Sequence, residues 1–144
     1  MSQVYYRIWI HLVWTTHLRQ PFLTKPIRIK LFEKINLISN EKGYQLDTIN
    51  GVEDHVHCLY SLKPKYSISK VVKDIKGSSS HWINENNICG EYFNWQDGFA
   101  AFSVSYKDVP MIRNYINNQE MHHADATLEK ELIQLNEYSS LKRN

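Results

Sequence analysis

The sequence contains only two cysteines, Cys58 and Cys89, and they do not form a CxxC pair. This argues against a disulfide framework and favours a reducing cytoplasm. No stretch approaches 18 consecutive apolar residues, so no membrane-spanning helix is expected. The first residues lack the basic start and cleavage site of a secretion signal and are typical of a first strand. No GxxxxGKS/T motif is present, which excludes the phosphate-binding loop of ATP-driven enzymes.

The excess of positive over negative charge is also small. The formal net charge is only +2, which does not by itself indicate a polyanionic partner. The distribution of charge is more informative. Basic residues cluster over residues 63–76, where Asp74 is the only acid, and such a face can attract phosphates. A solvated helix face explains the cluster equally well. The lysines concerned are Lys63, Lys65, Lys70, Lys73 and Lys76.

Periodic patterns predict an alternation of strands and helices. Apolar and aromatic residues alternate with period two over residues 4–14, which indicates a strand. Asn50-Gly51 is a strong signal for a hairpin turn. Gly77 falls inside a helical pattern, where it indicates close approach of another backbone or of a ligand. The expected elements are a strand at 4–14, a helix from Thr24 to Gly43, strands at 44–52 and 55–62, a helix beginning at Ser67, a strand at 99–106 and a helix at 109–123.

This order of elements, β-α-β-β-α-β followed by an extra helix, is typical of the ferredoxin-like (RRM-like) fold. We therefore expect one α+β domain over residues 1–144, in which an antiparallel sheet carries helices on one face. A C-terminal helix with Tyr115 follows the sheet, and the polar tail from about residue 124 is expected to be peripheral. Many functions share this fold, RNA-binding modules among them, so the fold alone does not define one.

Two histidines, His55 and His57, lie on the predicted third strand with Val56 between them. Side chains at positions i and i+2 of a strand share a face, and their Cα atoms lie about 7 Å apart. Both imidazoles can therefore reach one metal ion. The alternative is a pair of hydrogen-bonded histidines on a polar sheet face, because a metal site needs at least a third ligand.

The last predicted helix places Tyr115 and Gln119 on one face, because they are four residues apart. Ile112 and Ile116 lie on the same face. Taken alone, this pattern is explained by a buried amphipathic helix whose tyrosine is an aromatic anchor. The helix gains another interpretation only when it is considered together with the two histidines.

Together, these motifs resemble the single-tyrosine HUH transposases of small insertion sequences, the TnpA type of the IS200-like family. The resemblance covers nearly the whole chain, and Tyr115 follows His57 by 58 residues (115 − 57), an interval that suits the family. The matching segments are HLVWTTHLRQPFL (11–23), DHVHCL (54–59), SISKVVKDIKGSSS (67–80), WQDGFAAFSVS (95–105) and IRNYINNQEMHH (112–123).

The resemblance implies a role for each candidate residue. His55 and His57 match the two metal ligands, Tyr115 matches the nucleophile, and Gln119 matches the third ligand of members that use a glutamine. It implies Mg²⁺ or Mn²⁺ as the ion, and single-stranded DNA with hairpin ends as the partner. It also implies a homodimer whose active sites can be shared between subunits, in a bacterial or archaeal cytoplasm, at the nucleoid when DNA is bound.

The implied reaction is a strand transfer through a 5′-phosphotyrosine. A tyrosine is a poor nucleophile at neutral pH, because its ordinary pKa is about 10, and a divalent ion assists by stabilising the leaving 3′ oxygen. A second 3′-hydroxyl then rejoins the strand. The candidate phosphate contacts are Arg19, Lys63, Lys65, Lys70, Lys73 and Lys76.

Other functions stay open at this point. A domesticated HUH nuclease would process repeats without moving an element, and sequence cannot separate it from a transposase. A non-catalytic nucleic-acid-binding ferredoxin-like module would need no nucleophile, so the co-occurrence of the two histidines with Tyr115 and Gln119 argues against it. A small metal hydrolase would use water in place of Tyr115.

Overall fold

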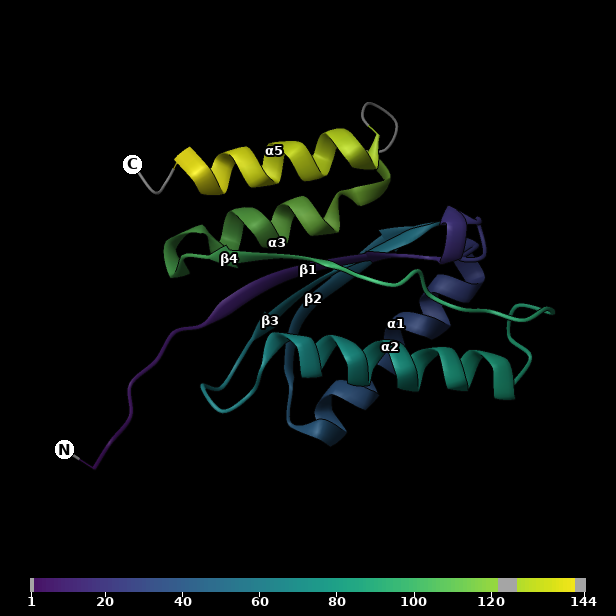
Figure 1. Cartoon of the computed structure of the whole chain (residues 1–144), viewed down its shortest axis with the longest axis horizontal. Coiled ribbons are helices and arrows are strands. Elements are labelled where there is room, and N and C mark those ends of the chain that lie inside the picture. The colour runs from purple at the N-terminus through teal and green to yellow at the C-terminus, as the bar shows by residue number, and fades with distance from the viewer. Residues whose placement is uncertain (1, 122–126, 142–144) are drawn as a thin grey trace.

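The structure, a computed structural model, describes residues 2–121 and 127–141. A four-stranded antiparallel sheet in the order β2-β3-β1-β4 forms its centre. Helices α1 and α2 cover one face of the sheet, and α3 and α5 lie over the other (Figure 1). The strands are β1 (Trp9–Thr15), β2 (Gln45–Val52), β3 (His55–Ser61) and β4 (Ala100–Val104). The helices are α1 (Lys25–Lys42), α2 (Ile68–Glu85), α3 (Val109–Asn117) and α5 (Leu128–Leu141), with short 3-10 turns η1 (His17–Arg19) and η2 (Tyr106–Asp108).

The predicted ferredoxin-like α+β fold is therefore confirmed, including the additional helix that carries Tyr115. The main core lies between the sheet and helices α1 and α2, where Leu12 and Cys58 from the two central strands meet Leu31 and Ile75. A smaller cluster on the other face joins Leu59 to the apolar side of α3. Among the described residues, no helix is long and apolar enough to cross a membrane.

The predicted ends of the first two helices are also confirmed. Thr24 precedes α1, and the helix ends at Gly43, whose φ of 79° lies in the left-handed region that favours glycine. Ser67 precedes α2, and its side chain accepts a hydrogen bond from the backbone N–H of Lys70. These ends depend on local chemistry, which explains why the sequence indicated them correctly.

Strand β1 is shorter than the alternating pattern suggested. It begins at Trp9 rather than at residue 4, and the side chains of Val4 and Tyr5 are exposed. Trp9 pairs with Ser61 on one side and with Val104 on the other, which are the last residues of β3 and β4. The strand begins where its neighbours can offer hydrogen bonds.

The predicted turn at Asn50-Gly51 is wrong. Both residues belong to β2, where Gly51 pairs with Val56, and the chain turns at Glu53 and Asp54 instead. A Cβ atom on Gly51 would meet the carbonyl oxygen of His55 and would lie 3.0 Å from Cα of Val56. The glycine is required because β3 passes close to it, and this accounts for the misleading turn signal.

Replacing Gly51 by alanine is expected to destabilise the protein by roughly 1–3 kcal/mol, the usual range for an atom forced into filled space. Backbone atoms of β3 would have to move, and they are less adaptable than the end of a side chain. The free energy of unfolding, measured by chemical denaturation, tests this expectation. Equal stability of Gly51→Ala and the wild type would contradict it.

Gly77→Ala is the matched control. Apart from Gly77 itself, its two chain neighbours and the adjacent backbone of α2, no described atom lies within 4 Å of where the Cβ of residue 77 would be, so close approach of another segment of the described chain does not explain this glycine. Because Gly77 lies inside α2, alanine there is expected to stabilise the protein by about 1 kcal/mol.

Candidate metal and nucleophile site

Strand β3 places His55 and His57 on the face of the sheet that packs against α3. Both side chains are fully buried, at 0% exposure, and their ring centroids lie 5.2 Å apart. Leu59, the next residue on the same face, packs with Ile112 and Ile116 of α3. The alternation of β3 therefore puts two imidazoles beside the helix that carries the tyrosine.

The Nδ1 atom of each histidine has a polar partner. Nδ1 of His55 lies 2.7 Å from Oδ1 of Asp54, and this hydrogen bond holds the pKa of Asp54 below its ordinary value. Nδ1 of His57 lies 2.8 Å from Nε2 of His11. Burial lowers the pKa of His11 to about 4, so His11 is neutral at pH 7 and can accept the hydrogen bond.

These partners assign a proton to Nδ1 of each histidine, by inference from the hydrogen bonds. Nε2 is then the atom that carries the metal-binding lone pair, both in His55 and in His57. Asp54 and His11 also fix the orientation of the two rings.

The predicted helix 109–123 is shorter than expected. Helix α3 ends at Asn117, and Asn118 forms a turn before a second helical stretch that begins with Gln119. Gln119 nevertheless stays beside Tyr115, since its Nε2 lies 3.5 Å from the tyrosine backbone oxygen. The ring centroid of Tyr115 lies 6.0 Å from that of His57. His122 and His123, the end of the predicted helix, lie outside the described residues.

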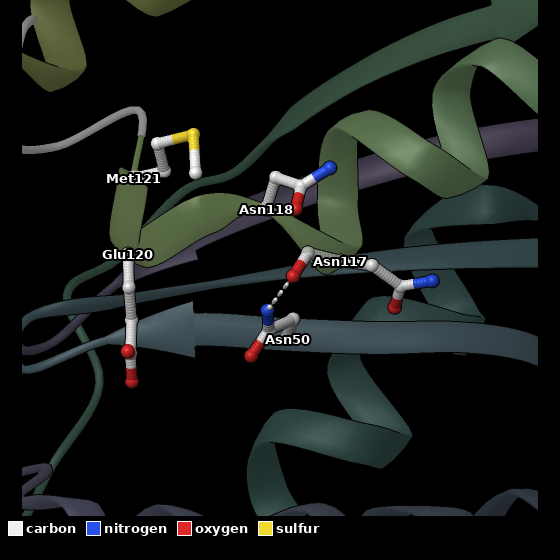
Figure 2. Close-up of a pocket in the computed structure, with 5 residues that line it drawn as sticks. All are labelled: Asn50, Asn117, Asn118, Glu120 and Met121. Atoms are coloured by element: carbon white, nitrogen blue, oxygen red, sulfur yellow. Dashed lines mark hydrogen bonds between the residues drawn. The ribbon is translucent and has the colours of Figure 1, made fainter.

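Asn50 of β2 holds the end of the tyrosine helix. Its Nδ2 donates hydrogen bonds to the backbone oxygen of Ile116, at 2.9 Å, and to that of Asn117, at 3.2 Å. Figure 2 shows the second of these bonds. Carbonyls at a helix end need such partners, because they have none within the helix. An open pocket of about 430 Å³ lies beside this contact and is lined by Asn50, Asn117, Asn118, Glu120 and Met121 (Figure 2).

Glu131 of helix α5 joins the predicted site residues. Its side chain is only 2% exposed. Oε1 accepts hydrogen bonds from the hydroxyl of Tyr115 and from Nε2 of Gln119, the second at 3.1 Å. Oε1 also lies 3.7 Å from Nε2 of His57, and Oε2 lies 3.9 Å from Nε2 of His55. The structure thus brings the four predicted residues together in one chain, around a fifth residue.

The surroundings of Tyr115 keep its hydroxyl protonated. Burial, the hydrogen bond to Glu131 and the charge of that carboxyl group together raise the pKa of Tyr115 well above its ordinary value of 10. The hydroxyl is therefore the donor in its contact with Glu131 at neutral pH.

The donor set fits a divalent cation. His55, His57 and Glu131 are all buried, and one ligand atom from each lies within 4.8 Å of the others. Imidazole nitrogens suit transition ions, and carboxyl oxygens suit Mg²⁺ and Mn²⁺. Oε1 of Gln119 is also buried, and it accepts no hydrogen bond from the described residues. This amide oxygen is therefore a further candidate ligand.

The predicted phosphate contacts on α2 lie on the other side of the sheet from this site (Figure 1). Lys70 and Lys73 are exposed there, as are Lys63 and Lys65 in the segment that precedes the helix. Lys76 differs, because its Nζ donates to the backbone oxygens of residues 96 and 98, at 2.6 and 2.8 Å. Lys76 therefore ties α2 to the segment before β4.

Arg19, the other predicted phosphate contact, borders the site itself. Its Nε lies 3.3 Å from Oδ2 of Asp54, the residue that hydrogen-bonds His55. Its Nη1 forms an ion pair with Glu129 of α5. Arg19 thus connects the turn after β1 to both the hairpin of the histidines and the helix of Glu131.

Three residues of the site were absent from the sequence prediction. Asp54 had a local signal, because it directly precedes His55. His11 lies on a predicted strand, but only the pairing of β1 with β3 places it beside His57. Glu131 shares a helix face with Leu128, Leu132 and Leu135, a spacing that indicates a buried face, but it lies in the segment expected to be peripheral.

Comparisons with known proteins indicate the family to which the chain belongs. Residues 4–119 match a family model described as "Transposase IS200 like". ISDra2 transposase TnpA of Deinococcus radiodurans is 26% identical over 121 residues, a match that covers 79% of this chain and 85% of that protein.

Two solved structures share the fold. One is the 1.90 Å crystal structure of a Deinococcus radiodurans R1 protein assigned as a transposase, with a TM-score of 0.66 and 24% identity, covering 83% of this chain and 98% of that chain. The other is a REP-associated tyrosine transposase bound to a REP hairpin. Its TM-score is 0.59 and its identity 21%, and the match covers 85% of this chain and 74% of that chain.

Because the family model spans most of the chain, the protein belongs to the IS200-like transposase family. The resemblance found in the motifs is thereby confirmed, and so is its main functional implication. The protein is a DNA transposase, a class of enzyme that cleaves DNA.

The raised pKa of Tyr115 gives a prediction that NMR can test. In protein labelled with ¹³C at tyrosine Cζ, the resonance missing from Tyr115→Phe identifies Tyr115. This resonance is expected to keep its neutral-phenol shift at pH 10, because burial and Glu131 disfavour the phenolate. Glu131→Gln removes the charge but leaves the burial, so it should lower the pKa only in part. A Tyr115 that titrates at or below pH 10 in the wild type would contradict the prediction.

Proposed function

We propose that this protein cleaves and rejoins single-stranded DNA at the ends of a transposable element, with Tyr115 as the nucleophile. We further propose that a divalent cation, Mg²⁺ or Mn²⁺, is held by His55, His57 and Gln119. One observation carries the proposal: the Tyr115 hydroxyl, the Gln119 amide and both Nε2 atoms converge on one carboxyl group. A nucleophile within reach of a cation-binding set is what phosphoryl transfer requires.

When bound, the cation polarises the scissile phosphate and stabilises the 3′ oxygen that leaves. The protein's own residues hold the parts in place. Asp54 and His11 fix the rings of His55 and His57 through their Nδ1 atoms. Asn50 holds the end of α3, and so the position of Tyr115 relative to the sheet.

In the proposed cleavage step, the phenol oxygen of Tyr115 forms a bond to phosphorus while the bond from phosphorus to the 3′ oxygen breaks. Tyr115 loses one proton and the departing 3′ oxygen gains one. The products are a 5′-phosphotyrosine and a 3′-hydroxyl. Attack by a second 3′-hydroxyl reverses the exchange, rejoins the strand and restores the tyrosine. The energy of the broken bond is kept in the phosphotyrosine, so no ATP is consumed.

The proposal requires the site to open when DNA enters. His55, His57 and Gln119 are fully buried in the structure, and a phosphate group cannot contact buried atoms. The cover includes helix α5, which contributes Glu131. A shift of α5 would expose Tyr115 without disturbing the sheet that carries the histidines.

We also propose a homodimer that binds hairpin-ended DNA through Arg19 and the exposed lysines Lys63, Lys65, Lys70 and Lys73. The strand order leaves β2 and β4 as the edges at which two sheets would join. Lys70 and Lys73 would contact the DNA backbone rather than the reacting phosphate, since they belong to α2, which lies across the sheet from the helix of Tyr115.

Tyr115→Phe is expected to abolish formation of a covalent protein–DNA adduct, because phenylalanine has no oxygen to attack phosphorus. The assay combines the full chain, Mn²⁺ and a 3′-labelled hairpin-ended oligonucleotide from the flanks of the gene, and resolves adducts on a denaturing gel, because the 5′-phosphotyrosine keeps the 3′ fragment on the protein. Removal of the cation with EDTA should also abolish the adduct.

Tyr92→Phe is the control, because Tyr92 is 76% exposed. It should form adduct at the wild-type rate. An adduct of normal yield with Tyr115→Phe would exclude Tyr115 as the nucleophile. Cleavage without any adduct in the wild type would favour a hydrolase that uses water.

Lys73 and Lys76 should behave differently when each is replaced by alanine. Lys73→Ala is expected to weaken single-stranded DNA binding and to reduce the slope of log K against log salt by about 0.7, the value for one lost phosphate contact. Lys76→Ala should leave the slope unchanged and cost about 1–3 kcal/mol of stability, because its two carbonyl partners lose their donor. Fluorescence anisotropy at several salt concentrations, with chemical denaturation, separates the two effects. An unchanged slope with Lys73→Ala would remove this lysine from the DNA surface.

A further inference from the structure

A carboxyl group from helix α5 faces both candidate histidine ligands. Oε1 of Glu131 lies 3.7 Å from Nε2 of His57, and Oε2 lies 3.9 Å from Nε2 of His55. The two oxygens of one carboxyl group thus face the two Nε2 atoms. Because Asp54 and His11 hydrogen-bond the Nδ1 atoms, Nε2 is the ligand atom of each ring. The family resemblance implies a ligand set of two imidazoles and an amide, and it assigns Glu131 no part.

Burial makes this placement informative. Glu131 is 2% exposed, whereas the acids Glu129 and Glu137 of the same helix are exposed. A buried carboxylate is unfavourable unless it is hydrogen-bonded and its charge is compensated. The hydroxyl of Tyr115 and the amide of Gln119 supply hydrogen bonds to Oε1. A divalent cation between the carboxylate and the two imidazoles would compensate the charge.

The geometry points to Glu131 as a protein ligand of the divalent cation in the DNA-free protein, so that the cation fastens helix α5 over Tyr115. The inference rests on the cation site proposed above. Gln119 has two roles in this arrangement. Its Nε2 donates a hydrogen bond that orients Glu131, and its Oε1 is the candidate ligand that the resemblance implies.

The addition of a carboxylate changes the expected chemistry of the site. Two imidazoles and an amide are all neutral, whereas Glu131 brings a negative charge that strengthens binding of any divalent ion. Because two of the ligands are imidazoles, the site should favour Mn²⁺ over Mg²⁺. The preference for Mn²⁺ comes from the histidines, and the gain in affinity comes from Glu131.

Mn²⁺ binding to the full chain without DNA tests the inference apart from catalysis. Free Mn²⁺ is measured by electron paramagnetic resonance during a titration with MnCl₂, and the rise in Tm with Mn²⁺ gives a second measure. The variants are Glu131→Gln, which keeps the shape and removes the charge, and Glu131→Asp, which keeps the charge. Glu137→Gln is the matched control on the same helix, because Glu137 is exposed.

Wild type and Glu137→Gln are expected to bind Mn²⁺ equally. Glu131→Gln should bind at least about tenfold more weakly, the lower end of the loss seen even for groups that only orient a ligand. Glu131→Asp should fall between them. Wild-type affinity in Glu131→Gln would overturn the inference. If Glu131→Gln does not fold, Glu131→Asp decides, and Mn²⁺ affinity and a Mn²⁺-dependent rise in Tm equal to those of the wild type would overturn the inference, because a carboxyl group one methylene shorter cannot keep the same contact with the cation.

The outcome is separable from that of the proposed function. Failure of the wild type to bind Mn²⁺ without DNA would overturn the role of Glu131 in the DNA-free protein. The covalent adduct assay would still decide whether Tyr115 acts with a cation once DNA is present. Loss of adduct in Tyr115→Phe together with unaltered Mn²⁺ binding in Glu131→Gln would support the function and reject this inference alone.

Discussion

The antiparallel pairing of β1 with β3 is the constraint on which the site depends. It sets Thr15 opposite His55 and Val13 opposite His57, and the alternation of both strands then decides which side chains meet. One face of this pair is apolar and builds the main core with α1 and α2. The other face carries His11 and His57 in hydrogen-bond contact. A single register therefore produces the core and the polar site together, on opposite sides of the same two strands.

The features that the sequence predicted well are local in origin. The C-terminal cap of α1 at Gly43 and the N-terminal cap of α2 at Ser67 depend on a few neighbouring residues. The shared face of His55 and His57 depends only on the geometry of one strand. The same holds for Tyr115 and Gln119, which remain neighbours although the helix breaks between them. Family membership followed from the order of these local motifs along the chain.

The features that the sequence could not predict depend on contacts between distant segments. Gly51 occurs in a motif typical of a turn, but the neighbouring strand determines its use. His11 and His57 are 46 residues apart and meet only through strand pairing. Glu131 shares a helix face with Leu128, Leu132 and Leu135, but this spacing indicates only burial and does not show that the buried face meets the histidines of β3. In the sequence Lys76 is equivalent to the neighbouring lysines, but in the fold its amino group donates hydrogen bonds to two backbone oxygens of a distant segment.

The two-residue turn at Glu53 and Asp54 has a consequence for how this chain can vary. The backbone oxygen of Asp54 accepts a hydrogen bond from Thr16, and that of Glu53 accepts one from Leu23, so the turn is joined to the segment after β1. A residue inserted directly after Asp54 would shift β3 by one position, turning both imidazoles into the apolar core and Val56 and Cys58 toward the tyrosine. Length changes at this hairpin should therefore be eliminated by natural selection, whereas the exposed residues before β1 can gain or lose length without moving a site residue.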